Sequence, residues 1–534
     1  QINTNVTDLE KYLGNEIIKQ EYKHFGNIFV DTEFDGTLQS FKIEDLTIVT
    51  EGLLQLNLKG EINEILDVDK LNYAVDISNI ETGIRDLSIF TDSLPELLNQ
   101  IEFIAYKGFL EGNVNSYNLV GDLTTNLGEI NSDLYLNFNE NFSNATYNGQ
   151  VGIEDFSLGQ LLQNDSLGKI SLTANVNGSG LSLDSLNAAL DAKVALFQFN
   201  NYSYKDLTID GSFVKQKFDG KLAIKDDNLD FDFTGLVDFN DSIPILNFKA
   251  NLDKFYAKKL NLMSMPLFAK LKIDANLKGI TAEDITGNIS IKDVYLENGK
   301  QNWQTDSIVF FSDKTNKKNR QVALKSDLVN IDINGNYSFA TLPQILLNFG
   351  NEFFPFSTLI SQDSLIAKST LKDEFINARM SLKNIIPLAQ LFELKLEKLD
   401  SAILTFKLDA PTSLGEFKFF IPEIKYSGIY ADSIFIDANT KNNEALLASL
   451  KIDSINYNDL AYIPDFKIDA KFFEQKANLS TIIKNSEAKN SLNLTTVLEK
   501  NNEDLIAQIL SPLILNTKKW QLVENASYNL SAKE

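Results

Sequence analysis

Nearly the whole chain alternates apolar and polar residues with a period of two, which is the pattern of a β-strand whose two faces differ. In the stretch VNIDINGNYSF, residues 329–339, the odd positions are apolar except for Gly335. Glycine weakens the interior of a strand and often marks a bend or a turn. The alternation therefore predicts a β fold, and the glycine sets the question of how its strands end or curve.

The same feature recurs, because ten of the 26 glycines lie on the apolar phase of a strand pattern. A turn at Asn334-Gly335 would make a β-hairpin, whereas a mid-strand glycine would let a long strand curve. Residues 229–239 favour the curve, because a turn at Gly235 would leave two short stubs between polar turns. The glycines that we predict to bend strands are Gly60, Gly149, Gly178, Gly211, Gly235, Gly279 and Gly335.

Strands that bend at similar positions would fold the sheet about a line, with the apolar face inside because the glycines occupy that face. The sequence thus predicts an all-β fold: an elongated, curved antiparallel repeat sheet that forms a U-shaped apolar groove, with a few short helices. We expect residues 1–534 to form one continuous groove of about 30 to 40 strands. Apolar segments at helical spacing, three of them with proline near the start, predict helical inserts near 92–102, 156–163, 342–354 and 384–394.

The composition excludes several function classes. With 73 acidic and 49 basic residues the net charge is −24, so the surface would repel nucleic-acid phosphates, and no nucleic-acid partner is expected. The chain has no cysteine, which excludes thiol catalysis, and its one histidine, His24, is expected to be structural or exposed, so a Ser-His-Asp site is not expected. Carboxylate pairs such as Asp230 and Asp232 remain, but any solvated strand face produces that spacing. We therefore expect a protein that is not an enzyme and holds no metal or cofactor.

Phenylalanine is abundant, with 37 residues, and many of them share the apolar phase. A sealed sandwich core would use the same residues as an open groove for lipid, and the alternation does not separate these two interpretations. The candidate residues for lining a lipid groove are Phe197, Phe199, Phe231, Phe233, Val237, Phe239, Ile331, Ile333, Tyr337 and Phe339.

Four segments, residues 156–190, 202–239, 322–349 and 430–452, resemble the TamB family (translocation and assembly module subunit) of the AsmA-like superfamily, particularly its Bacteroidetes-type forms. The resemblance is carried by the strand patterning and not by a catalytic motif. It implies a periplasmic bridge between the inner and outer membranes of a Gram-negative bacterium. Such a bridge would shield the acyl chains of phospholipids in a hydrophobic groove on their way to the outer membrane.

The resemblance also implies an outer-membrane barrel partner of the TamA/BamA type. Neither the family's inner-membrane helix nor its carboxy-terminal domain is recognisable, so we expect a middle fragment of a longer chain. The inner-membrane anchor and the contacts with the barrel would then lie outside it. Two other functions stay open. One is an assembly factor or chaperone for outer-membrane proteins that accepts their strands by β-augmentation, and the other is a dry-core adhesin or structural β-solenoid.

Overall fold

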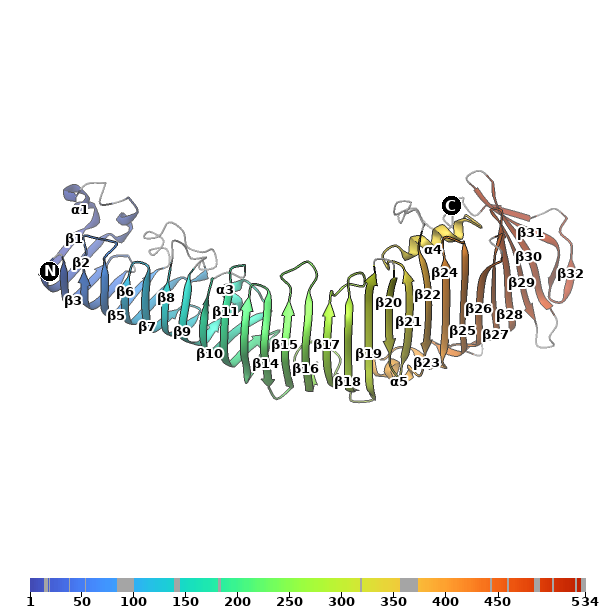
Figure 1. Cartoon of the computed structure of the whole chain (residues 1–534), viewed down its shortest axis with the longest axis horizontal. Helices are drawn as coiled ribbons and strands as arrows, with labels where there is room; N and C mark the ends of the chain where they lie inside the picture. The colour runs from blue at the N-terminus through green and yellow to red at the C-terminus, as the bar shows by residue number, and fades with distance from the viewer. Residues whose placement is uncertain are drawn as a thin grey trace. The chain divides into compact units, whose positions relative to one another are not determined.

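The fold is shown in Figure 1 as a computed structural model. The structure describes residues 1–534 except 14–17, 19, 38, 53, 84–99, 139–144, 181–183, 317–318, 356–372, 442–443, 459–460, 485–489, 502–503, 524–525 and 530–534. Strands make up 70% of it and helices 7%, so the predicted all-β class, an open antiparallel sheet with a few short helices, is confirmed. The chain divides into two compact units, Gln1–Ala269 and Lys270–Glu534, each described here by itself.

In unit 1 the strands follow one another as antiparallel neighbours, apart from the short β12, which lies beside β11. The strands are β1 (Ile2–Asn5), β2 (Asn27–Thr37), β3 (Ser40–Thr50), β4 (Gln55–Asn63), β5 (Asn72–Gly83), β6 (Phe103–Asn113), β7 (Ser116–Thr125), β8 (Gly128–Asn137), β9 (Thr146–Ser157), β10 (Leu167–Ser179), β11 (Asn187–Phe199), β12 (Tyr202–Tyr204), β13 (Leu207–Val214), β14 (Lys217–Lys225), β15 (Leu229–Asp238) and β16 (Ile245–Tyr256). The helices are α1 (Val6–Leu13), the 3-10 helix η1 (Gln20–Phe25) and α3 (Leu158–Leu162).

Unit 2 follows a similar plan after β17 (Phe268–Lys278), whose first residues belong to unit 1, but some of its short strands do not pair with the strand before them in the chain. Its strands are β18 (Thr286–Glu297), β19 (Asn302–Asn316), β20 (Asn319–Lys325), β21 (Val329–Asn336), β22 (Phe375–Leu382), β23 (Leu396–Leu399), β24 (Ala402–Asp409), β25 (Leu414–Tyr426), β26 (Ile429–Lys441), β27 (Ala445–Tyr457), β28 (Ala461–Phe473), β29 (Lys476–Lys484), β30 (Asn490–Asn501), β31 (Asp504–Leu515), β32 (Lys518–Trp520) and β33 (Ala526–Asn529). Its helices are α4 (Leu342–Asn351) and α5 (Ile386–Leu391).

Three of the short helices lie in segments where the sequence predicts helical inserts, whereas α1 and η1 were not predicted. Helix α3 lies within 156–163, α4 within 342–354 and α5 within 384–394. Helices α4 and α5 both carry proline at the first or second position, where the missing N–H costs no hydrogen bond. Most of the predicted insert near 92–102 lies outside the described residues.

The strands continue through the two glycines that posed the question of bend or turn. Gly235 lies inside β15 and pairs with Gly220 of β14 and Phe248 of β16. Its φ is +139°, and an added Cβ would lie 2.3 Å from the Asn247 carbonyl oxygen, so only glycine fits there. Gly335 pairs with Arg320 and Ile376 in the same way. No hairpin forms at Asn334-Gly335, and β21 ends one residue later at Asn336.

The other predicted glycines divide into two groups. Gly60, Gly149, Gly178 and Gly211 lie within strands, and Gly60 and Gly149 have the positive φ angles of +151° and +144°. Gly279 follows the end of β17, where its φ of +83° belongs to a turn. The prediction that Gly279 bends a strand is therefore wrong, because β17 ends one residue before it, at Lys278.

A set of β-bulges, which the sequence analysis did not predict, keeps the apolar face on one side. In β9 the apolar positions run through Tyr147, Val151 and Ile153 and then resume at Phe156, a slip of one residue. Asp155, with φ of +50°, lies at this irregularity, where the pairing with β10 shifts register. A bulge inserts one extra residue into its strand, so Phe156 still points to the same face of the sheet as Ile153 although the two are three positions apart. Register shifts of this kind recur in the pairings of β3 with β4, β5 with β6 and β15 with β16.

Candidate functional site: an apolar groove

The register places side chains of successive strands in rows that cross the sheet of unit 1. One row, through Phe231, reads Ile2, Val30, Ile48, Leu56, Ile80, Tyr106, Leu123, Ile130, Ile153, Leu172, Val194, Leu207, Ile224, Phe231 and Leu252. The next, through Phe233, reads Thr32, Leu46, Leu58, Ile77, Gly108, Gly121, Ser132, Val151, Ala174, Ala192, Ile209, Leu222, Phe233 and Ala250.

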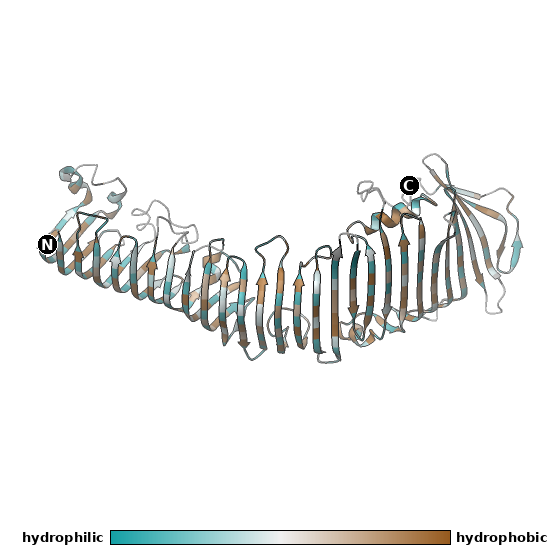
Figure 2. Cartoon of the chain, in the orientation of Figure 1, coloured by the Kyte–Doolittle hydropathy of each residue, from teal (hydrophilic) through white to brown (hydrophobic). Residues whose placement is uncertain are grey.

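These rows contain no charged residue among the residues that the structure describes, and neither do the parallel rows through Gly235 and Val237. The opposite face differs sharply, because the row through Asp232 also carries Asp122 and Lys193. Figure 2 shows the resulting bands of hydrophobic and hydrophilic residues along the strands. The sheet of unit 1 therefore presents one apolar face without charge along its strands.

Unit 2 has the same arrangement. The row through Ile333 reads Gly287, Ser312, Val322, Ile333, Ala378, Phe406, Phe417, Ala438, Ala448, Ala470, Leu479, Thr496 and Ile509. The row through Ile331 reads Ile289, Phe310, Leu324, Ile331, Met380, Leu404, Phe419, Ile436, Leu450, Ile468, Thr481 and Leu494. Within these two rows, too, no described residue is charged.

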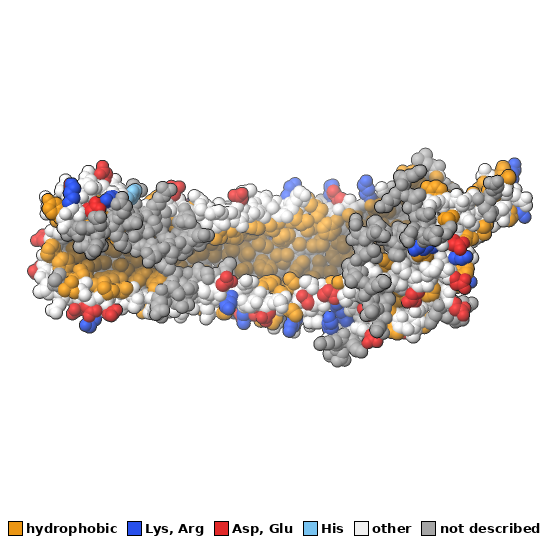
Figure 3. Space-filling model, turned by 90° about the horizontal axis from the view of Figure 1, so that it is seen from above, with side chains coloured by type: hydrophobic (Ala, Val, Ile, Leu, Met, Phe, Trp, Pro, Cys, Tyr) orange, Lys and Arg blue, Asp and Glu red, His pale blue; other side chains and the backbone are white. Residues whose placement is uncertain are grey.

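The apolar face lines a hollow. Figure 3 shows hydrophobic side chains gathered in a depression between rims where charged side chains lie. Most of the side chains in the row through Phe231 are half-buried, with Tyr106, Val194 and Leu207 as buried members. In a sealed sandwich core such residues would be fully buried. The lining of unit 1 is therefore an open groove whose walls keep part of their apolar surface accessible.

The predicted lining residues do not all lie in these rows. Phe231, Phe233 and Val237 share β15, and Phe233 contacts the rings of Phe218 and Phe248 at 5.9 and 5.1 Å between centroids. Ile331 and Ile333 share β21 of unit 2.

The remaining candidates lie at the edges of the groove. Phe197 and Phe199 of β11 pack in a buried cluster with Leu260, from the turn after β16. Phe239 follows β15 and is 43% exposed. Tyr337 and Phe339 lie beyond β21, in the segment that leads to α4.

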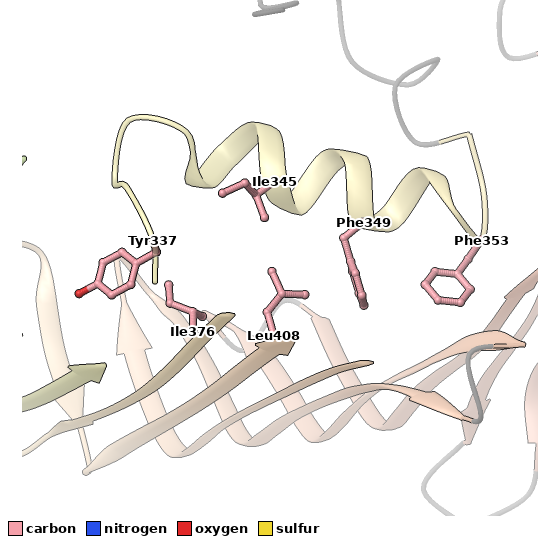
Figure 4. Close-up of a cluster of buried hydrophobic side chains, with 6 residues drawn as sticks. All are labelled: Tyr337, Ile345, Phe349, Phe353, Ile376 and Leu408. Carbon is pink, nitrogen blue, oxygen red and sulfur yellow. The ribbon is translucent and has the colours of Figure 1, made fainter. Parts of the chain in front are cut away.

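Helix α4 covers part of the groove in unit 2. Ile345, Phe349 and Phe353 point down onto Ile376 of β22 and Leu408 of β24 (Figure 4). The Phe349 ring also lies against Gly415, where an added Cβ would come within 2.6 Å of the ring. Gln475 fixes the far end of this segment, because its backbone N–H donates to the Phe353 carbonyl oxygen at 3.2 Å.

The acidic residues considered as catalytic candidates are engaged in ion pairs. Lys225 Nζ lies 2.6 Å from Asp230 and 2.8 Å from Asp232, and the hydrogen bond to Asp230 is the largest cause of its raised pKa. Among the described residues no group of three or more His, Asp or Glu side chains could hold a metal ion. None of the described helices is long and apolar enough to cross a bilayer.

No protein-family model matches the chain, and neither a curated protein nor a solved structure matches it. The fold and the groove by themselves define a class of β protein. It is an open antiparallel sheet with β-bulges and with glycines inside its strands, and its apolar face lines a groove whose central rows carry no charge among the described residues.

Proposed function

We propose that the protein shields the acyl chains of phospholipids in its apolar groove and so carries them between membranes, without acting as an enzyme. The observation that carries this proposal is the absence of charge from the rows through Phe231, Phe233, Ile331 and Ile333, across the described strands of each unit. On the resemblance to the TamB family, we place this function in the periplasm of a Gram-negative bacterium, with a TamA/BamA-type barrel as the partner of regions outside this chain.

The energetics explain why a charge-free lining matters. Moving an acyl chain from a bilayer into water costs about 0.8 kcal/mol per CH₂, so a sixteen-carbon chain costs on the order of 12 kcal/mol. An apolar groove lowers that cost only where its lining is uninterrupted, because each charged gap restores part of the barrier. A lining of Phe, Leu, Ile, Val, Ala and Gly also offers no specific pocket that would trap the lipid. The half-buried state of these side chains leaves surface for the acyl chain to cover.

The test is site-specific photo-crosslinking. A photo-reactive residue at Phe233 should capture phospholipid, and so should one at Ile333. Matched controls are Thr234 and Asn334, which follow these residues on the same strands and face the other side of the sheet. Capture of lipid at Thr234 and Asn334 as efficiently as at Phe233 and Ile333 would contradict the proposal. Crosslinks to outer-membrane proteins would instead favour the assembly factor, and no bound lipid after gentle purification would favour the dry-core solenoid.

A further inference from the structure

Arg320 is a charged residue on the groove face of unit 2, at the start of β20, where its position pairs with Gly335. Arg320 is 2% exposed, and its guanidinium carbon lies 4.9 Å from the Phe339 ring centroid and 5.8 Å from that of Tyr337. Its Nη2 donates to the Ala282 carbonyl oxygen, but Nε and Nη1 have no hydrogen-bond acceptor. A buried cation with unused donors is costly, so the fold retains it against its own stability.

The group that faces Arg320 is a carboxylate held by two other donors. Glu283 Oε1 accepts from Ser338 Oγ at 3.1 Å and from the Ala340 backbone N–H at 2.7 Å. Its Oε2 lies 3.7 Å from Arg320 Nη1, which is an ion pair but too long for a hydrogen bond. A guanidinium, a hydroxyl and a backbone N–H thus converge on one anionic position.

This position lies at the beginning of α4, because Ala340 precedes the helix by two residues. The N-terminus of a helix favours an anion through its partial positive charge and its free N–H groups. The Glu283 side chain is 38% exposed, so it can leave the position toward solvent without unpacking the sheet. The buried Arg320 cannot leave in the same way.

From this geometry we propose that Arg320, Ser338 and the Ala340 N–H form a binding site for a phosphate group, which Glu283 occupies in exchange with the phosphate. A guanidinium donates charge-assisted hydrogen bonds to phosphate, and Nη1 of Arg320, the nitrogen that lies 3.7 Å from Glu283 Oε2, has no hydrogen-bond acceptor. Ser338 and Ala340 both donate to the same oxygen of the Glu283 carboxylate, Oε1, and the other oxygen does not reach hydrogen-bond distance of Arg320. A tetrahedral phosphate has more oxygens, so it can accept from Ser338 and Ala340 and also from Arg320.

The proposal rests on the proposed lipid function for the source of the phosphate. The site lies beside Ile376, which pairs with Gly335 in the same row and lies under α4. A phospholipid whose phosphate binds Arg320 would therefore place its acyl chains against the apolar face of unit 2. The site would recognise the headgroup phosphate, while the groove itself makes no distinction among apolar chains.

Isothermal titration calorimetry on the whole chain tests this with three probes: dihexanoyl phosphatidylglycerol, inorganic phosphate and dihexanoylglycerol, which lacks phosphate. Glu283→Gln removes the competing charge and should bind the phospholipid about tenfold more tightly than the wild type. Arg320→Met removes the guanidinium and should bind it at least tenfold more weakly. Neither substitution should change the binding of dihexanoylglycerol.

The two substitutions should change the affinity for the phospholipid in opposite directions. This distinguishes a phosphate site from an ion pair that only holds α4 in place. Both substitutions break the Arg320–Glu283 ion pair, so a pair that only holds α4 would respond to both in the same direction, and that result would overturn the proposal. Thermal denaturation of Glu283→Gln checks that its fold is retained. Inorganic phosphate binding as tightly as the phospholipid would overturn the lipid headgroup as the source. Lipid crosslinks at Phe233 without any effect of Arg320→Met would leave the groove function standing and refute this site alone.

Discussion

Gly220 of β14 and Gly235 of β15 pair with each other, and neither leaves room for a side chain. An added Cβ on either glycine would lie 2.5 Å from a Cα atom of the next strand, which is β13 for Gly220 and β16 for Gly235. Gly220 is thereby pressed against Gly211 of β13, and Gly235 against Phe248 of β16. A run of adjacent strands consequently approaches closely along one line of unit 1. Close approach of this kind is what a sheet needs in order to bend sharply toward its apolar face.

Replacing Gly235 with valine should destabilise the sheet strongly. The positive φ and the nearby Asn247 carbonyl oxygen both oppose a β-branched residue, so we expect a loss of about 2–4 kcal/mol in the free energy of unfolding. Gly152→Ala is the matched control, since an added Cβ there meets nothing closer than 3.6 Å. Thermal denaturation followed by circular dichroism compares them. Equal melting temperatures for the two variants would show that the bend does not depend on Gly235.

Deleting Asp155 should be far more damaging than substituting it. Without the extra residue, the end of β9 moves by one position and Phe156 turns from the apolar face to the polar face. Asp155→Gly keeps the residue count and suits the φ of +50°, so its effect should stay within about 1 kcal/mol. The two melting curves, measured in parallel, test the role of the bulge. A deletion variant as stable as the glycine variant would contradict it.

A charge placed on the groove face should block lipid movement without unfolding the sheet. Ile333→Asp puts a carboxylate in a row that otherwise has no charge, and we expect lipid transfer between vesicles to fall at least tenfold. Asn334→Asp places the same charge on the opposite face and should leave transfer unchanged. Circular dichroism of both variants monitors the fold. Global unfolding of Ile333→Asp would point instead to a sealed core.

Alkaline pH should weaken the turn between β14 and β15. Burial, together with a hydrogen bond from the Tyr202 hydroxyl to Asp226, raises the pKa of Tyr202 from 10.0 to about 12. The neutral phenol therefore stabilises the fold fully below pH 10, and this contribution is lost as the pH rises from 10 to 12, because the unfolded chain ionises first. Spectrophotometric titration of tyrosine, compared with Tyr202→Phe, measures it. If the tyrosine absorbance that is lost in Tyr202→Phe titrates with a midpoint near 10, the raised pKa of Tyr202 is contradicted.

The strands, and the position of Gly235 inside one of them, could be read from the sequence because they depend on residues close together in the chain. The alternation in residues 229–239 needs no distant partner, and neither does the placement of Gly235 within a strand. The bulges left a readable trace as well: between Ile153 and Phe156 the apolar period slips by one residue, and such a slip beside an aspartate is a usable signal. The slip was missed because period-two reasoning treats it as the end of a strand.

The site around Arg320 could not be read in this way. It joins Glu283, Arg320 and Ser338 from three separate parts of unit 2, and none of them stands out from the polar residues around it. The packing of α4 likewise depends on Gly415, because the absence of a side chain there leaves room for the Phe349 ring, which is distant in the sequence. Tyr337 and Phe339 continue the strand alternation in sequence but leave the strand in space, because β21 ends at Asn336.

The pairing of β-strands with their neighbours in the chain has a consequence for how such a protein can change in length. Within unit 1, β13, β14 and β15 each pair with the next strand, so one hairpin can be added or removed without altering the partners of the rest. Each hairpin would lengthen or shorten the unit by about 9–10 Å, two strand spacings. Duplication of hairpins could thus change the length of the unit in fixed steps, while the cross-section of its sheet stays the same.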